Sequence, residues 1–164
     1  MKKAILFIAC FAVLVLTLSA YTDRATAPVV GYYSPALSLT ANDSTTTTLD
    51  GMKGKYVLVT FWSSSDAASR LRCNRYDALC DGNDRLEHIA VNFDRNETLF
   101  EEVVRRDNLS RSSQYHVEGQ QAHVIMKLYH LDRGLHSFLI DPSGVIRSID
   151  PDYAQARNLM PELI

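Results

Sequence analysis

The pattern of hydrophobic and polar residues in the middle of the chain predicts a strand followed by a helix. Residues 55–62 (KYVLVTFW) form an apolar run with β-branched and aromatic side chains, as in a strand that is buried on both faces. The run ends at Ser63-Ser64-Ser65-Asp66, four residues that are all good helix N-caps. From Asp66 to about Asp81 the spacing predicts a helix, which Gly82 closes.

Strand-like and helix-like patterns also occur in the rest of the chain. The predicted strands form a hairpin at 37–39 and 45–48, a single strand at 89–93 and a second hairpin at 138–141 and 145–149. The predicted helices run from Asp94 to Arg106, with a capping-box-like start at Asp94 and Glu97, over 120–131 and from Pro151 to the end. The resulting order, β-β-β-α-β-α-α-β-β-α, predicts a single α/β domain without internal repeats.

The first 20 residues have the pattern of a secretory signal. Lys2 and Lys3 precede an apolar run over residues 4–16, and small residues follow up to Ala20. Cleavage after Ala20 is the favoured interpretation, while retention of residues 4–20 as a membrane anchor is the alternative, because the run is borderline in length for spanning a bilayer. We therefore expect a signal peptide or anchor at 1–20, a tether at 21–33 and a domain at 34–164 that works outside the cytoplasm, in a bacterial periplasm.

Composition and charge narrow the range of partners. The chain has 164 residues, enough for one ordinary domain. Without Lys2 and Lys3, 15 basic residues stand against 19 acidic ones, a balance that argues against binding nucleic acid. Three cysteines, of which Cys10 lies in the leader, are too few for a small disulfide-stapled fold.

Two segments resemble a known family when they are taken together. Residues 54–62 (GKYVLVTFW) precede a polar turn, and residues 138–144 (FLIDPSG) lie near the end of the chain. This arrangement resembles the thioredoxin fold, and more closely the extracytoplasmic thiol–disulfide oxidoreductases of the cytochrome-maturation type, within the alkyl hydroperoxide reductase/thiol-specific antioxidant superfamily. The resemblance covers roughly residues 34–150. It implies a three-layer α/β/α sandwich with an N-terminal β-hairpin, and a C-terminal β-hairpin plus helix.

The chain departs from that family at its reactive site. In the family, W-C-x-x-C opens the helix after the strand, and a cis-proline precedes the later strand. Here Asp66 takes the position of the nucleophilic cysteine, Ser69 that of the resolving cysteine and Leu135 that of the proline. A carboxylate is stabilised by the dipole at a helix N-terminus, but it cannot exchange disulfides. The resemblance therefore implies a retained fold with a degenerate active site.

Cys73 and Cys80 are the thiols that remain beyond the leader. On a continuous helix, seven residues rise about 10.5 Å, whereas a disulfide needs Cα atoms about 4.4–6.8 Å apart. The pair could join only if the helix broke between them. The favoured interpretation is two buried small hydrophobic residues, and the alternative is a displaced redox pair.

Two further clusters have both a chemical and a structural interpretation. Ser63 to Asp66 would need a neighbouring base for nucleophilic chemistry, and helix capping explains them without one. His116, His123, His130 and His136 are weak candidates for a metal site, with Asp132 as a possible carboxylate ligand. His123 and His130 lie about two turns apart on a helix, which is wide for two ligands of one zinc ion, so we expect neither metal nor cofactor.

Two functions follow from these observations. The first is a non-catalytic binding or scaffold domain, which contacts a protein or peptide partner at the Ser63–Asp66 turn. The second is a thiol–disulfide oxidoreductase or peroxide-reducing relative that uses Cys73, with or without Cys80. Solvent access to Cys73 discriminates between them, because a reactive thiol must be reachable and partly ionised.

Overall fold

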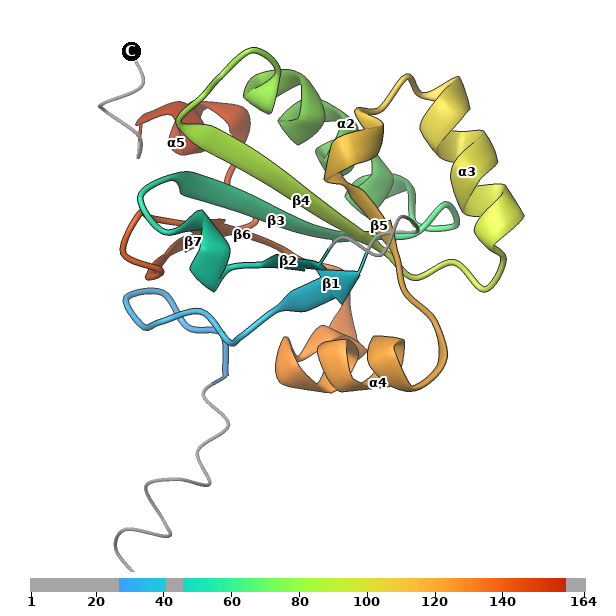
Figure 1. Cartoon of the computed structure of the whole chain (residues 1–164), viewed down its shortest axis with the longest axis horizontal. Coiled ribbons are helices and arrows are strands. Elements are labelled where there is room, and N and C mark those ends of the chain that lie inside the picture. The colour runs from blue at the N-terminus through green and yellow to red at the C-terminus, as the bar shows by residue number, and fades with distance from the viewer. Residues whose placement is uncertain (1–26, 41–45, 159–164) are drawn as a thin grey trace, which may run out of the picture.

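A computed structural model describes residues 27–40 and 46–158 (Figure 1). Five strands form one mixed sheet in the order β5-β4-β3-β6-β7. Strands β3, β4 and β5 run parallel, whereas β6 and β7 run antiparallel to their neighbours. The strands are β1 (Ser38–Thr40), β2 (Thr46–Thr48), β3 (Tyr56–Trp62), β4 (Leu86–Asn92), β5 (Gln114–His116), β6 (Ser137–Ile140) and β7 (Ile146–Ile149). The α-helices are α2 (Ala67–Cys80), α3 (Glu97–Arg106), α4 (Gly119–Leu128) and α5 (Tyr153–Asn158).

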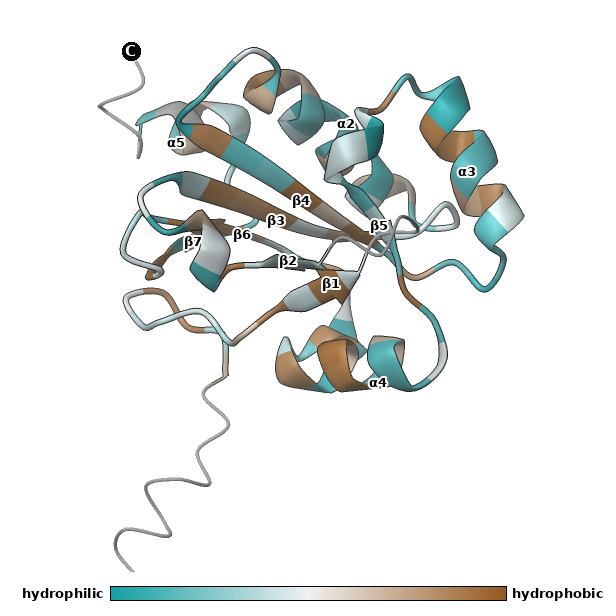
Figure 2. Ribbon diagram, viewed as in Figure 1, coloured by the Kyte–Doolittle hydropathy of each residue, from teal (hydrophilic) through white to brown (hydrophobic). Residues whose placement is uncertain are grey.

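The sheet lies between two covering layers. Helices α2, α3 and α5 cover one face, and α4 with the β1–β2 hairpin covers the other (Figure 1). This is the predicted three-layer α/β/α sandwich with an N-terminal and a C-terminal hairpin, so the sequence-based fold class is confirmed. Figure 2 shows hydrophobic residues along β3, in the middle of the sheet, and more hydrophilic ones on α2 and α3.

Strand β3 is central because its side chains are buried on both faces. Val57, Val59 and Phe61 belong to the core under α4, whereas Leu58 and Trp62 belong to the clusters under α2, α3 and α5. A strand of this kind has no solvated face, which is why its sequence shows no polar alternation. The C-terminal end of β3 is therefore held in place from both sides, and the turn that follows starts from a rigid base.

Several local expectations differ from the structure. Helix α3 begins at Glu97 and is capped by Asn96, whose side chain accepts a hydrogen bond from the Leu99 N–H at 3.2 Å, so Asp94 is not part of the cap. Strand β5 and the short 3-10 turns at 50–52, 111–113 and 131–133 have no counterpart in the prediction. Strand β5 forms by pairing with the distant strand β4, whereas the 3-10 turns are closed by local hydrogen bonds and are too short to show a periodic pattern.

The N-terminal segment joins the domain earlier than its composition suggests. The Gly31 N–H donates to the Ile146 carbonyl at 2.8 Å, and the Ile146 N–H donates to the Tyr32 carbonyl at 2.9 Å. The last three residues of the predicted tether, 31–33, therefore lie along the edge of β7. The leader at 1–20 lies outside the described residues. Within residues 27–40 and 46–158, no helix combines the length and hydropathy needed to cross a bilayer.

Candidate functional site

The turn between β3 and α2 is organised by Asp66. Its side chain caps α2 by accepting a hydrogen bond from the Ser69 N–H at 2.9 Å. Ser69 is fully buried, and its hydroxyl donates to the Asp66 carbonyl at 3.1 Å. The Ser63 N–H donates back to this hydroxyl at 3.4 Å. The side chains of Asp66 and Ser69 thus both stabilise the first turn of α2.

Asp94, two residues after the end of the neighbouring strand β4, holds the serines of this turn. Its Oδ1 accepts hydrogen bonds from the Ser63 hydroxyl at 2.7 Å and from the Ser64 N–H at 2.9 Å. Its Oδ2 accepts from the Ser64 hydroxyl and from the Asn92 amide, the latter at 3.0 Å. Asp94 is only 6% exposed, so this carboxylate replaces its lost hydration by hydrogen bonds from the protein.

Strand register explains how Asp94 reaches the turn. Trp62 and Asn92 are paired in the parallel ladder, so the residues that follow β3 and β4 emerge at the same edge of the sheet. The Asp94 N–H donates to the Asn92 side chain at 2.9 Å, which fixes the local bend. His116, at the end of β5, contacts the Asp94 carbonyl through Nε2 at 2.8 Å. Because a carbonyl can only accept, that Nε2 carries a hydrogen.

Electrostatics favour the ionised form of Asp94. Burial by itself raises the pKa of the carboxyl group, but hydrogen bonds from Ser64, Ser63 and Asn92 outweigh it and hold the pKa below its usual value. A carboxylate with a lowered pKa stabilises the folded state above its unfolded pKa of about 3.9, and this contribution is lost as the pH falls through the folded value.

We therefore expect acid to loosen the turn through Asp94. The free energy of unfolding should decrease as the pH falls below about 4, and the Asp94→Asn variant should show a shallower decrease because its side chain does not titrate. Urea unfolding at a series of pH values measures both slopes. Identical pH dependence in the wild-type protein and the variant would contradict this assignment.

Both cysteines in the described part of the chain are free thiols. Cys73 is completely buried, and its sulfur donates a hydrogen bond to Oε1 of Gln114 at 3.7 Å. Burial raises the pKa of the Cys73 thiol to about 12, with Gln114 opposing the shift. Cys80 is half-buried at the last residue of α2, and burial raises the pKa of its thiol as well. Helix α2 is continuous from Ala67 to Cys80, which keeps the two sulfurs on different turns.

The loop before β6 lies against both β3 and α2. The peptide bond preceding Leu135 is trans, and the Leu135 carbonyl accepts a hydrogen bond from the Arg72 guanidinium on α2. The Phe61 N–H donates to the His136 carbonyl at 3.1 Å. The ring of His136 donates from Nδ1 to the Asp150 carboxylate, with 2.6 Å between the two atoms. These bonds fix the loop from the side of the sheet.

Comparison with known proteins places this geometry in a structural class. No protein-family model and no curated protein matches the chain. Among solved structures, the thioredoxin domain of a thiol-disulfide oxidoreductase from Bacteroides vulgatus matches with a TM-score of 0.69 at 22% identity, over 82% of this chain and 96% of that one. A thioredoxin-like protein from Parabacteroides distasonis matches with a TM-score of 0.65 at 27% identity, over 84% and 96%.

The fold is thioredoxin-like. A putative thiol:disulfide interchange protein DsbE from Chlorobium tepidum agrees, with a TM-score of 0.61 at 20% identity over 82% of this chain and 94% of that one. The resemblance to the thioredoxin fold seen in the sequence is therefore confirmed. Within the thioredoxin-like pattern, the three positions of the redox site hold Asp66, Ser69 and Leu135, and each of them has a structural contact instead of a thiol or a cis-proline.

The four histidines do not gather around one point of the thioredoxin-like domain. His116 stacks on Phe100, with 5.4 Å between ring centroids, and His136 is bound to Asp150. His123 and His130 are exposed, the first on α4 and the second after it. Across the described residues, no three or more His, Cys, Asp or Glu side chains come together in a way that could hold a metal ion.

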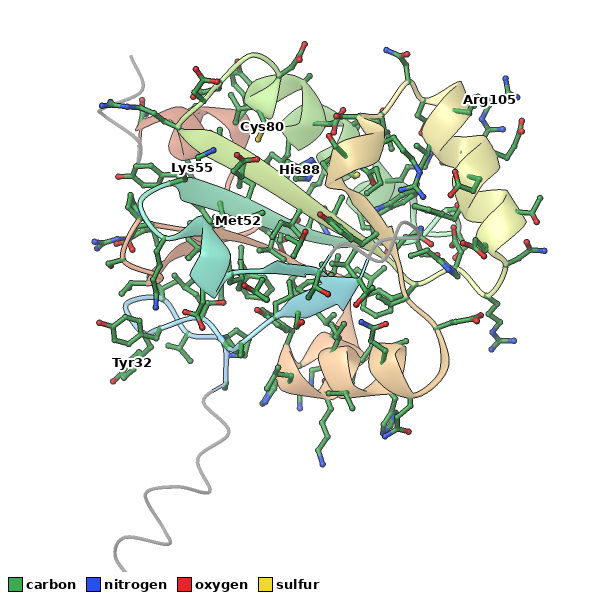
Figure 3. All side chains as sticks on the ribbon, in the orientation of Figure 1. Tyr32, Met52, Lys55, Cys80, His88 and Arg105 are labelled. Atoms are coloured by element: carbon green, nitrogen blue, oxygen red, sulfur yellow. The ribbon has the colours of Figure 1, made fainter. Side chains whose placement is uncertain are left out.

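The sequence does not reveal the role of two buried polar side chains, Asp94 and His88. The spacing of Asp94 and Glu97 predicts a helix cap, but Asp94 follows β4 at the same sheet edge as the serines that follow β3, and this shared edge is the signal for its contact with them. His88 is buried on β4, where Nε2 lies 3.1 Å from the Thr60 hydroxyl and Nδ1 lies 3.4 Å from Asp77. Figure 3 shows His88 and Cys80 on the α2 side of the sheet. Nothing in the local sequence distinguishes His88 from a surface histidine.

Proposed function

We propose that this chain is an extracytoplasmic thioredoxin-like domain that has lost the redox cysteines and acts as a non-catalytic binding or scaffold domain. The observation that carries the proposal is the use of Asp66 and Ser69, at the two cysteine positions, as partners in a helix cap. A carboxylate and a hydroxyl in these places stabilise the first turn of α2 but cannot form a mixed disulfide with a substrate.

The Ser63–Asp66 turn is the proposed contact surface. Ser65 is exposed, and its hydroxyl lies 3.0 Å from that of Ser63, which in turn donates to Asp94. Four hydrogen bonds to Asp94 from Ser63, Ser64 and Asn92 support this turn. A turn that is already ordered loses little conformational freedom on binding, which favours recognition of a protein or peptide partner.

The thiols support a structural role better than a catalytic one. An oxidoreductase or peroxide-reducing activity at Cys73 requires a thiolate that a substrate can reach. Cys73 is fully buried and its pKa is raised to about 12, so its sulfur packs with Trp62 and Phe100 as an apolar group. This environment argues against the alternative function.

The proposed extracytoplasmic location rests on the first 20 residues. Two lysines, the apolar run and the small residues before Ala20 follow the pattern of a secretory signal, and residues 4–20 would act as a membrane tether if the segment is retained. The negative balance of charge beyond the leader gives no support for a nucleic-acid partner.

Site-specific photocrosslinking tests the contact surface. A photoreactive benzoylphenylalanine in place of Ser65, in the full chain exported by its host, should give a discrete adduct with a partner. The matched control carries the same group in place of Gln120, which is exposed on α4 in the opposite layer. The additional Asp94→Ala substitution should reduce the adduct at position 65, because it releases the turn. Equal adduct yields at positions 65 and 120, or a yield at position 65 that Asp94→Ala does not change, would contradict the proposal.

A further inference from the structure

Exposed apolar side chains gather at the start of the domain. Among the residues that the structure describes, ten large hydrophobic side chains are exposed, and four of them fall within residues 29–33. These four, Val29, Val30, Tyr32 and Tyr33, are called the N-terminal apolar patch; their exposed fractions are 46%, 50%, 61% and 70%. A concentration of this kind on one short segment marks a contact surface, whereas single exposed hydrophobic residues do not.

Backbone hydrogen bonds hold the N-terminal apolar patch in place. The Tyr32 N–H donates to the Val29 carbonyl at 3.1 Å, which closes a turn around Gly31. Gly31 has φ +89°, a conformation that other residues rarely adopt. Backbone hydrogen bonds of Gly31 and Tyr32 with Ile146 of β7, and of Ser34 with Gly144 in the turn before it, then hold the segment at the sheet edge. Figure 3 shows the Tyr32 side chain at the outer edge of the molecule, directed away from the sheet.

We infer that the N-terminal apolar patch docks on the surface of a lipid bilayer, next to the point where residues 4–20 enter it. This inference rests on one form of the proposed function, in which residues 4–20 are retained as a membrane anchor instead of being cleaved off after Ala20. Eight residues lie between Ala20 and Val29, and the nine Cα–Cα steps that join these two residues span at most about 30 Å when extended. The tether therefore keeps the patch close to the bilayer, and its high local concentration makes a weak apolar contact sufficient.

The chemistry of the patch fits a membrane interface. Tyrosine has an apolar ring and a polar hydroxyl group, and it is enriched where acyl chains meet lipid headgroups. The neighbouring charges are neutralised in pairs, since Lys53 lies 2.7 Å from Asp50 and Arg147 lies 2.6 Å from Asp141. Because no excess charge faces the lipid from these pairs, docking should occur on zwitterionic phosphatidylcholine and change little with salt.

Fluorescence quenching by brominated lipid tests this surface in the full chain, purified with residues 1–20 and reconstituted into phosphatidylcholine vesicles. The reporter is a Tyr32→Trp variant, and the matched control is Tyr153→Trp. Tyr153 is 52% exposed on α5, which lies across the sheet from the N-terminal segment (Figure 1). The wild-type protein supplies the background from buried Trp62.

We expect lipid brominated near the headgroup to quench most of the added emission of Tyr32→Trp and little of that of Tyr153→Trp. Adding Val29→Ser and Val30→Ser to the reporter should relieve the quenching while the chain still floats with the vesicles. Quenching that survives both serines would come from tethering alone and would overturn the inference. A blue shift without quenching would mean that protein covers the patch, which also overturns it. If the chain does not float with the vesicles, the tether itself fails, whereas crosslinking at Ser65 is unaffected.

Discussion

The Asp94→Ala variant is expected to lose about 3 kcal/mol of unfolding free energy. The substitution removes an acceptor for four hydrogen bonds, from the Ser63 hydroxyl, the N–H and hydroxyl of Ser64 and the Asn92 amide. Each buried donor left without a partner costs about 1–3 kcal/mol, although part of this cost is relieved where water reaches the half-buried serines. Urea unfolding followed by circular dichroism measures the difference.

Two companion variants separate the role of Asp94 from a general effect of losing an acid. Asp132→Ala removes an exposed carboxylate and should change stability by less than about 0.5 kcal/mol. Asp94→Asn keeps the shape of the side chain but replaces one acceptor oxygen by a donor, so it should fall between the other two. If Asp94→Ala were as stable as Asp132→Ala, Asp94 would not be the support of the turn.

Restoring two cysteines should create a redox-active disulfide on the existing fold. In the double variant Asp66→Cys with Ser69→Cys, the two positions lie at the N-cap and third residue of α2, about 5 Å apart as expected for helical i and i+3 positions. A disulfide spans Cα atoms about 4.4–6.8 Å apart, so the bond should form without helix distortion. The helix N-terminus should also lower the pKa of the introduced outer thiol below about 8.5.

The readout is intact mass after equilibration in glutathione buffers of graded potential. We expect the oxidised double variant to lose one pair of hydrogen atoms and to regain them on reduction. The single variant Asp66→Cys should form no internal bond, because Cys73 lies seven positions further along, on α2, and its side chain is buried in the core. A double variant that stays reduced in oxidising buffer would show that this part of the fold, and not only the identity of two residues, has departed from the redox geometry.

Much of the fold could be predicted because its signals are local. Strand β3 is signalled by a continuous apolar run, and α2 by helical spacing that begins at an N-cap residue, Asp66. Both elements lie where the sequence predicts them. Strand β5 is different, since it has three residues and exists because Gln114, Tyr115 and His116 pair with the end of β4. A short strand defined by its neighbour leaves no periodic pattern of its own.

The site was harder to predict because its contacts join distant segments. The spacing of Asp94 and Glu97 matches a local capping pattern and therefore predicts a helix cap. In the structure Asp94 instead binds serines about 30 positions earlier in the chain. That interaction depends on parallel register between β3 and β4, which the sequence indicates only indirectly. The separation of Cys73 and Cys80 could be foreseen from helix geometry, but their burial depends on packing against residues such as Phe100 and Leu86.

The most direct test of the central claim is the accessibility of the two thiols. Intact-mass alkylation of the Cys10→Ser chain, native and denatured, with and without reductant, measures both oxidation state and exposure. Burial raises the pKa of the Cys73 thiol to about 12, so the thiol stays protonated at pH 7, and its complete burial also shields it from the reagent. We predict two free thiols that resist alkylation in the native protein and react fully once it unfolds. A Cys73–Cys80 disulfide, or one thiol that reacts rapidly in the native state, would contradict the account and favour an oxidoreductase.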